Sequence, residues 1–233
     1  MIFFWTEDRK DKSGYQFWEK FLGALYPQVV LESKTNSSEL VKSVAKINSN
    51  DTYIVALDHS FDNDQSIREI SALRKVIQKK NNVYELNLIS FEFVLLSFPL
   101  LLDWIYAEED EFREQRAVLV TVREKLLEAV HKQVDYKEVP EIAEWLNNIN
   151  EYNIEQITAK LLYGLTRNTG FSVDKSNTGV CWKTDCCGYG ERAADDKCGL
   201  DNRRPSLVEK MQAILRESFL EQEFKRMGLE AVL

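Results

Sequence analysis

Two kinds of hydrophobic pattern alternate along the first half of the chain. Short runs rich in β-branched and aromatic residues predict strands at 2–6, 28–32, 52–57 and 83–89. Between these runs, apolar residues recur three or four positions apart and predict helices, for example from Tyr15 to Leu25. Strands alternating with helices are typical of an α/β domain whose four-stranded sheet is mostly parallel and flanked by helices.

From Glu108 onward the apolar spacing is helical only. We therefore predict an α/β domain over residues 1–106 and a helical region over 107–233. Residues 207–229 predict a closing amphipathic helix. The apolar stretch 93–102 is shorter than the roughly 20 residues of a membrane span, so it predicts part of a buried helix running through Trp104, and no membrane association.

Acidic side chains are concentrated in one segment of the chain. The chain has 233 residues, of which 44% are hydrophobic and 29% are charged, as in ordinary folded proteins, and its net charge is -8. Residues 108–155 hold 13 acidic and 6 basic side chains, so they carry most of that charge. Bulk binding of nucleic acid is therefore excluded, but a local contact is not. The acidic segment is either a solvated helical face or a docking surface for a basic partner.

Features of the N-terminus and of the cysteines predict a cytoplasmic protein. The apolar start runs at once into Glu7, Asp8 and Arg9, unlike a signal peptide. The four cysteines fall together between residues 181 and 198, so they are not a disulfide framework for the whole fold.

Acidic residues follow three of the predicted strands. Glu7, Asp58 and Glu92 come after the first, third and fourth strands, and ligands of parallel sheets bind at these strand ends. If the first and third strands are neighbours, Glu7 and Asp58 repel each other unless a proton or a hard cation such as Mg²⁺ intervenes. Such an ion supports phosphoryl transfer or hydrolysis. The alternative is that acids here serve only as helix caps, as Asp62 and Asp64 could.

Two stretches resemble the acidic motifs of Toprim domains. In those domains a glutamate ends the first strand ahead of an aromatic-rich helix, and an Asp-x-Asp motif follows an apolar strand. The corresponding stretches are Phe3-Phe4-Trp5-Thr6-Glu7 with Phe17-Trp18-Glu19-Lys20-Phe21-Leu22, and Tyr53-Ile54-Val55-Ala56-Leu57-Asp58-His59-Ser60-Phe61-Asp62. The resemblance covers residues 1–105.

The resemblance implies a function and a site. Toprim domains occur in topoisomerases, primases, OLD-family nucleases and small proteins of mobile elements and phage defence, where these acids bind Mg²⁺ for strand transfer or cleavage. By resemblance, Glu7, Asp58 and Asp62 are the catalytic residues and the ligands of Mg²⁺ or Mn²⁺ in a nuclease acting on DNA or RNA. An ATPase partner that supplies nucleic-acid affinity is implied in the same way.

The chain departs from the Toprim pattern at two positions. Asp8 replaces the glycine after the motif glutamate, and Ser60 replaces the second aspartate of Asp-x-Asp, for which Asp62 could substitute. A non-catalytic interaction or regulatory protein that retains a degenerate Toprim fold is therefore the alternative. His59 is either a general base or incidental. A nucleotide-binding enzyme is the weakest interpretation, because no glycine-rich loop follows a predicted strand.

The cysteines form a cluster of their own. They follow the pattern C-x4-C-C-x10-C within a polar, glycine-rich loop at about 168–206, and comprise Cys181, Cys186, Cys187 and Cys198. Four thiolates suit a structural Zn²⁺, whereas a disulfide or redox pair and unliganded thiols are the alternatives. Basic and aromatic residues around the cluster could also contact a nucleic-acid backbone; they include Lys175, Trp182, Lys183, Tyr189, Arg192, Lys197, Arg203 and Arg204.

Overall fold

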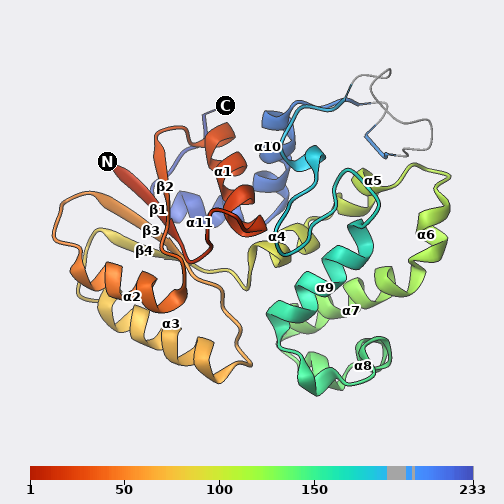
Figure 1. The fold of residues 1–233 in the computed structure, drawn as a ribbon, viewed down its shortest axis with the longest axis horizontal. Coiled ribbons are helices and arrows are strands. Elements are labelled where there is room, and N and C mark those ends of the chain that lie inside the picture. The colour runs from red at the N-terminus through yellow and green to blue at the C-terminus, as the bar shows by residue number, and fades with distance from the viewer. Residues whose placement is uncertain (188–197, 201–202, 233) are drawn as a thin grey trace.

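A parallel sheet forms the centre of the α/β half. The computed structural model describes residues 1–187, 198–200 and 203–232 (Figure 1). The sheet has four strands, all parallel, in the order β2-β1-β3-β4. The strands are β1 (Ile2–Thr6), β2 (Val29–Ser33), β3 (Thr52–Ala56) and β4 (Val83–Leu86). The prediction of an α/β domain with a four-stranded parallel sheet and flanking helices is confirmed.

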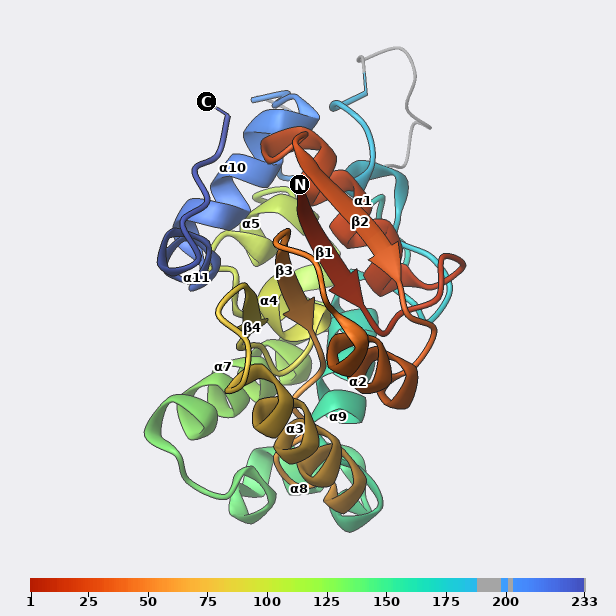
Figure 2. The same cartoon turned by 90° about the vertical axis from the view of Figure 1, so that its left-hand side faces the viewer.

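Helices cover both faces of the sheet. Successive side chains of a strand point to opposite faces, so Tyr53 and Val55 of β3 join one core while Ile54 and Ala56 join another. The first core lies under two helices, α2 (Ser37–Lys46) and α3 (Asp64–Ile77). The second lies under α1 (Ser13–Leu25), α4 (Phe91–Ser97), α10 (Leu207–Glu217) and α11 (Leu220–Arg226), as Figure 2 shows.

The remaining chain is helical, and its core is continuous with that of the sheet. Its helices are α5 (Leu101–Ile105), α6 (Glu111–Gln115), α7 (Ala117–Lys132), η1 (Tyr136–Glu138), α8 (Pro140–Leu146), η2 (Ile149–Glu151), α9 (Ile154–Thr166) and η3 (Val180–Trp182). In the described part of the chain no strand follows β4, apart from one isolated bridge between Val173 and Thr178. One hydrophobic cluster contains residues of β1, α4, α7 and α9, so it crosses the boundary predicted at residue 107.

The predicted helix through Trp104 is broken. The structure has α4 and α5 in its place, separated by residues 98–100. Phe98 is extended, with φ -59° and ψ 117°, because proline disfavours the helical conformation in the residue before it. Pro99 therefore splits the apolar stretch and is itself exposed, whereas its neighbours Leu96, Phe98 and Leu101 are buried in the core.

The predicted helix over 207–229 is also broken. The structure has α10 and α11, with Ser218 extended between them at φ -122° and ψ 172°. The Ser218 hydroxyl accepts a hydrogen bond from the Leu220 N–H at 3.3 Å. Serine is often found at such a position because its side chain satisfies an N–H at a helix start.

Within the described residues, no helix combines the length and the apolar character that a membrane crossing requires.

Candidate functional site

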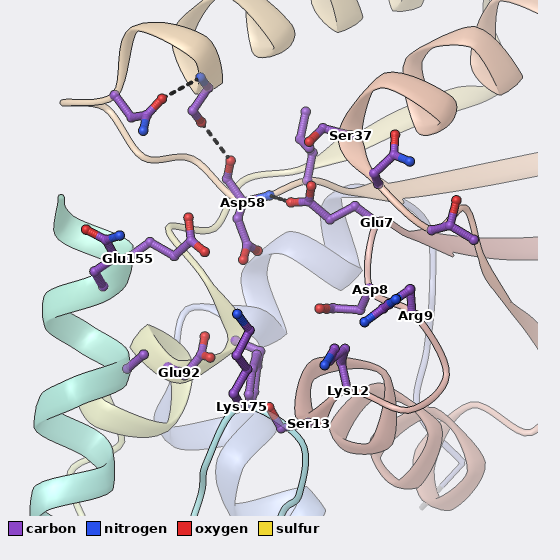
Figure 3. A pocket seen from close by; sticks show the side chains of 18 of the residues that line it. Glu7, Asp8, Arg9, Lys12, Ser13, Ser37, Asp58, Glu92, Glu155 and Lys175 are labelled. Atoms are coloured by element: carbon purple, nitrogen blue, oxygen red, sulfur yellow. Dashed lines mark hydrogen bonds between the residues drawn. The ribbon is translucent and has the colours of Figure 1, made fainter. Parts of the chain in front are cut away.

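A pocket opens where the predicted acids leave the sheet. The register pairs Thr6 with Ala56, so the residues that follow β1 and β3 emerge side by side. The pocket has a volume of about 750 Å³ and is bordered by the ends of β1 and β3 and by α1, α2, α3, α4 and α9. The acids that line it include Glu7, Asp8, Asp58, Glu92 and Glu155, which are labelled in Figure 3, together with Glu69 and Asp174.

Glu7 and Asp58 are in direct contact. The backbone N–H of Asp58 donates a hydrogen bond of 3.0 Å to Oε1 of Glu7. Ser37, at the first residue of α2, also bonds to the Glu7 carboxylate and lowers its pKa. The structure therefore brings together two of the three predicted catalytic acids.

Asp8 is turned into the pocket by its neighbours. Its N–H donates to Oγ1 of Thr6 at 3.2 Å, and that hydroxyl lies 3.3 Å from Oδ2 of Asp8. Gly14, in the first turn of α1, makes room for the carboxylate, since a Cβ at that position would lie 2.1 Å from Oδ2 of Asp8. The sequence indicates Asp8 only as a departure from the Toprim pattern.

Glu92 and Glu155 come from the first turns of two packed helices. Ser90 caps α4 by accepting a 3.2 Å hydrogen bond from the Phe93 N–H, which places Glu92 at the pocket. Asn153 caps α9 in a capping box, which places Glu155 opposite. Glu155 also accepts a 3.1 Å hydrogen bond from the Ser60 hydroxyl. Glu155 is a further residue of the site, and the sequence did not predict it.

Burial and mutual repulsion raise the pKa values of four carboxyl groups of the pocket, those of Glu7, Asp8, Asp58 and Glu92. Burial is the main cause and raises the pKa of Glu7 to about 7, of Asp8 to about 6 and of Glu92 to about 8. The pKa of Asp58 is also well above its ordinary value. The negative charge of Glu155 contributes to all four increases. Proton uptake by several of them is therefore linked.

The donor set of the pocket suits a hard cation, because all its acidic donors are carboxylate oxygens. A divalent cation would favour the charged forms that burial disfavours. As the side chains stand, no three His, Cys, Asp or Glu residues in the described ranges are arranged to hold a metal ion. Coordination at this pocket would therefore require rotation of carboxylate side chains.

Asp62 faces away from these acids. Its carboxylate accepts hydrogen bonds from the Tyr136 hydroxyl and, at 3.1 Å, from the Ile154 N–H, and it lies 3.3 Å from Nζ of Lys137. The structure does not bring it to the pocket with Glu7 and Asp58. Asp62 instead holds the first residue of α9, next to Glu155.

His59 also lies apart from the carboxylates. Its Nε2 lies 2.8 Å from Oε1 of Glu85, a carboxylate that Arg74 binds in a bidentate manner. It borders a second cavity beside α3. Its imidazole is thus paired with Glu85 and not with Glu7 or Asp58.

The described part of the cysteine loop is held by Trp182 and Lys210, both buried. Trp182 donates a 2.7 Å hydrogen bond to the carbonyl of Phe171, and Nζ of Lys210 donates to the carbonyls of Cys181 and Thr184 at 2.6 and 2.7 Å. Residues 188–197 and 201–202 of the predicted loop lie outside the described residues.

The cysteine side chains lie within electrostatic range of one another. Burial, followed by the proximity of Cys198, raises the pKa of Cys181 to about 11, and Cys186 and Cys187 add to the increase. In the part of the chain that the structure describes, their thiols are not arranged as a metal site. A structural zinc at Cys181, Cys186, Cys187 and Cys198 therefore stays a prediction.

Comparisons with known proteins do not assign the chain. No family model, curated protein or solved structure matches it.

Proposed function

We propose that this protein is a Toprim-like nuclease that uses Mg²⁺ or Mn²⁺ to cleave phosphodiester bonds in DNA or RNA. The observation that carries the proposal is the contact between Glu7 and Asp58 within a pocket lined by further carboxylates at the carboxyl edge of the sheet. Carboxylates whose pKa values are raised by burial and by each other cluster at functional sites.

In this proposal Glu7, Asp58 and Asp8 hold the metal ion, and Glu92 and Glu155 complete the ring of oxygen donors. A divalent cation held by these residues would polarise the phosphodiester and stabilise the leaving oxygen. The chain itself positions these groups: the Asp58 N–H orients Glu7, the Thr6 hydroxyl orients Asp8, and Ser60 orients Glu155.

In this proposal Glu155 supplies the carboxylate that the Toprim pattern has at the position of Ser60. The Toprim pattern has an acid at that position, whereas here the serine hydroxyl lies 3.1 Å from the Glu155 carboxylate. We infer that a carboxylate from α9 takes the place of the missing second aspartate. Asp62, which the sequence favoured for this role, is engaged with Tyr136 and Lys137 instead.

The pocket also offers groups that suit nucleic acid. Tyr163 of α9 borders it and is 47% exposed, so its ring is accessible to an unpaired base. Arg9, Lys12 and Lys175 border the same pocket and carry the opposite charge to phosphate. These features support a nucleic-acid substrate over a neutral small molecule.

The test is cleavage of single-stranded and duplex DNA and RNA with Mg²⁺ or Mn²⁺. We expect Glu7→Gln and Asp58→Asn each to reduce the rate by about 100-fold or more. Glu19→Gln and Asp103→Asn are matched controls, because these side chains are 55% and 59% exposed and do not border the pocket. Equal activity of all four variants would overturn the proposal.

The alternative is a non-catalytic interaction protein, and Ser60 at the position of a motif acid is the observation that favours it. Under this alternative the chain binds its partner without turnover, and Mn²⁺ does not raise its melting temperature. A ligand that binds the folded state stabilises it, so a Mn²⁺-dependent thermal shift abolished by Asp58→Asn would count against this alternative.

A further inference from the structure

A short turn of the helical region reaches over the carboxylate pocket. Residues 173–175 border it together with the acids, and the side chain of Lys175 points toward the carboxylates in Figure 3. The turn is closed by the bridge between Val173 and Thr178 and by the hydrogen bond from the Asp174 N–H to the Asn177 carbonyl at 3.0 Å. Lys175 thus enters the site from a segment far from the sheet in sequence.

This turn is fixed on both sides of Lys175. Before it, Oδ1 of Asp174 accepts from the N–H groups of Ser176 and Asn177 at 2.7 and 2.9 Å. After it, Nε2 of Gln16 in α1 donates to the Ser176 carbonyl at 2.9 Å. Oε1 of Gln16 accepts from the N–H and hydroxyl of Thr178 at 3.3 and 3.4 Å. One glutamine of the α/β half therefore holds the backbone that carries Lys175.

Lys175 differs from the other two cations of the pocket. Arg9 and Lys12 each lie 3.6 Å from a carboxylate oxygen of Asp11. Among the residues that the structure describes, no carboxylate forms an ion pair with Lys175. Its ammonium group therefore faces the acids without being committed to one of them, which leaves it available to an anion that enters with a metal ion.

We propose that Lys175, held by Gln16, contacts a non-bridging oxygen of the phosphate that is cleaved, and that it thereby aligns the substrate opposite Glu7 and Asp58. This inference rests on the proposed nuclease function. A lysine is suited to the role because its ammonium is a compact point charge for phosphate. The role needs only its charge, and no proton transfer is assigned to it.

The test compares Lys175→Met, Lys175→Arg and Gln16→Ala with wild type and with Lys79→Met, an exposed lysine that does not border the pocket. The first readout is binding of a labelled single-stranded oligonucleotide, as DNA and as RNA, at fixed Ca²⁺ and varied salt. Loss of one phosphate contact lowers the slope of log affinity against log salt by about 0.7. We expect that change for Lys175→Met, a smaller one for Gln16→Ala, and none for Lys175→Arg or Lys79→Met.

The second readout is cleavage with Mn²⁺, together with Mn²⁺ affinity. We expect Lys175→Met to lose about 100-fold in kcat/KM and to bind Mn²⁺ at least as tightly as wild type, since a cation beside the carboxylates has been removed. Wild-type slope and rate in Lys175→Met would overturn the inference and leave the nuclease proposal standing. A reduced slope in Lys175→Met, when the wild-type protein cleaves no substrate, would show a phosphate contact but would overturn the nuclease proposal and, with it, the alignment of a cleaved phosphate. Absence of both binding and cleavage in wild type would overturn both.

Discussion

The hydroxyl of Ser60 donates a hydrogen bond to the carboxylate of Glu155, which lies 95 residues further along the chain. Ser60 is buried and follows β3, whereas Glu155 belongs to the first turn of α9. Their contact joins the sheet edge to the helical region at the pocket. A carboxylate of α9 thus lies beside the serine that we compare with the second acid of the Toprim motif.

Loss of the Glu155 charge is expected to affect both metal binding and cleavage. Glu155→Gln keeps the size of the side chain and an acceptor for Ser60 but removes a charge that raises four neighbouring pKa values. We expect about 10-fold or greater weakening of Mn²⁺ binding, measured by calorimetry, and a comparable loss of cleavage. Glu144→Gln, at an exposed position of α8, is the control. Unchanged Mn²⁺ affinity in Glu155→Gln would remove Glu155 from the site.

The raised pKa values predict that the metal-free protein loses stability as the pH rises. The folded state holds protons on Glu7 and Glu92 up to about pH 7 and 8, whereas the unfolded chain releases them near 4.5. The unfolded state therefore binds fewer protons in this window. The free energy of unfolding falls by about 1.4 kcal/mol per pH unit for each such group.

Thermal melts in chelator between pH 5 and pH 8.5 measure this effect. We expect the melting temperature to fall across that range, and the stabilisation by Mn²⁺ to be larger at the alkaline end, where the cation no longer competes with protons. Glu92→Gln should flatten the profile. A melting temperature that rises over the same range would contradict the assignment.

Two glycines of α1 offer a matched pair of substitutions. At Gly14 a Cβ would lie 2.1 Å from Oδ2 of Asp8, whereas at Gly23 it would meet nothing within 4 Å. Gly14→Ala is expected to displace the Asp8 carboxylate and to weaken Mn²⁺ binding. Gly23→Ala is expected to stabilise the fold by up to about 1 kcal/mol, because alanine favours helix, and to leave Mn²⁺ binding unchanged. Equal Mn²⁺ affinity in both variants would show that Asp8 is not needed at the site.

Asp62 is expected to act on stability more than on cleavage. Asp62→Ala removes the acceptor of the Ile154 N–H and the Tyr136 hydroxyl, which should cost about 1–3 kcal/mol of unfolding free energy. Asp62→Asn keeps an acceptor, so we expect its cleavage rate to stay within about 10-fold of wild type. Denaturant melts and cleavage rates test both variants. A loss with Asp62→Asn as large as with Asp58→Asn would restore Asp62 as a metal ligand.

The zinc prediction is tested by metal analysis of protein purified without chelator. About one equivalent of zinc is expected if the four cysteines form a site. Cys181→Ser and Cys198→Ser should each lower that content, while Asp58→Asn should not. Zinc below about a tenth of an equivalent in wild type would leave thiols or a disulfide as the alternatives.

The sequence was informative where local pattern and fold coincide. The strands were predictable because buried parallel strands are short apolar runs, and the pairing of Glu7 with Asp58 followed from where such strands end. The break between α4 and α5 was predictable from the local sequence, because Pro99 disfavours the helical conformation in the residue before it.

The place of Glu155 at the pocket could not be predicted from local sequence. Its neighbours carry a helix-start signal, Asn153 followed by Gln156, and Glu155, Ala159 and Tyr163 share one helical face that borders the pocket. The spacing of these residues identifies the face, but it does not predict which part of the molecule the face lies against. The contact with Ser60 depends on how α9 packs on α4, a long-range arrangement that no local pattern encodes.

The continuous core that joins β1 to α9 has a further consequence. One wall of the pocket belongs to the sheet, and the other is carried by α9 and by the turn that holds Lys175. The core is therefore continuous across the boundary that we predict near residue 107. We expect core substitutions in the helical half, even far from any acid, to displace α9 and the Lys175 turn relative to the sheet edge. Such substitutions should reduce activity at the pocket while the sheet remains folded.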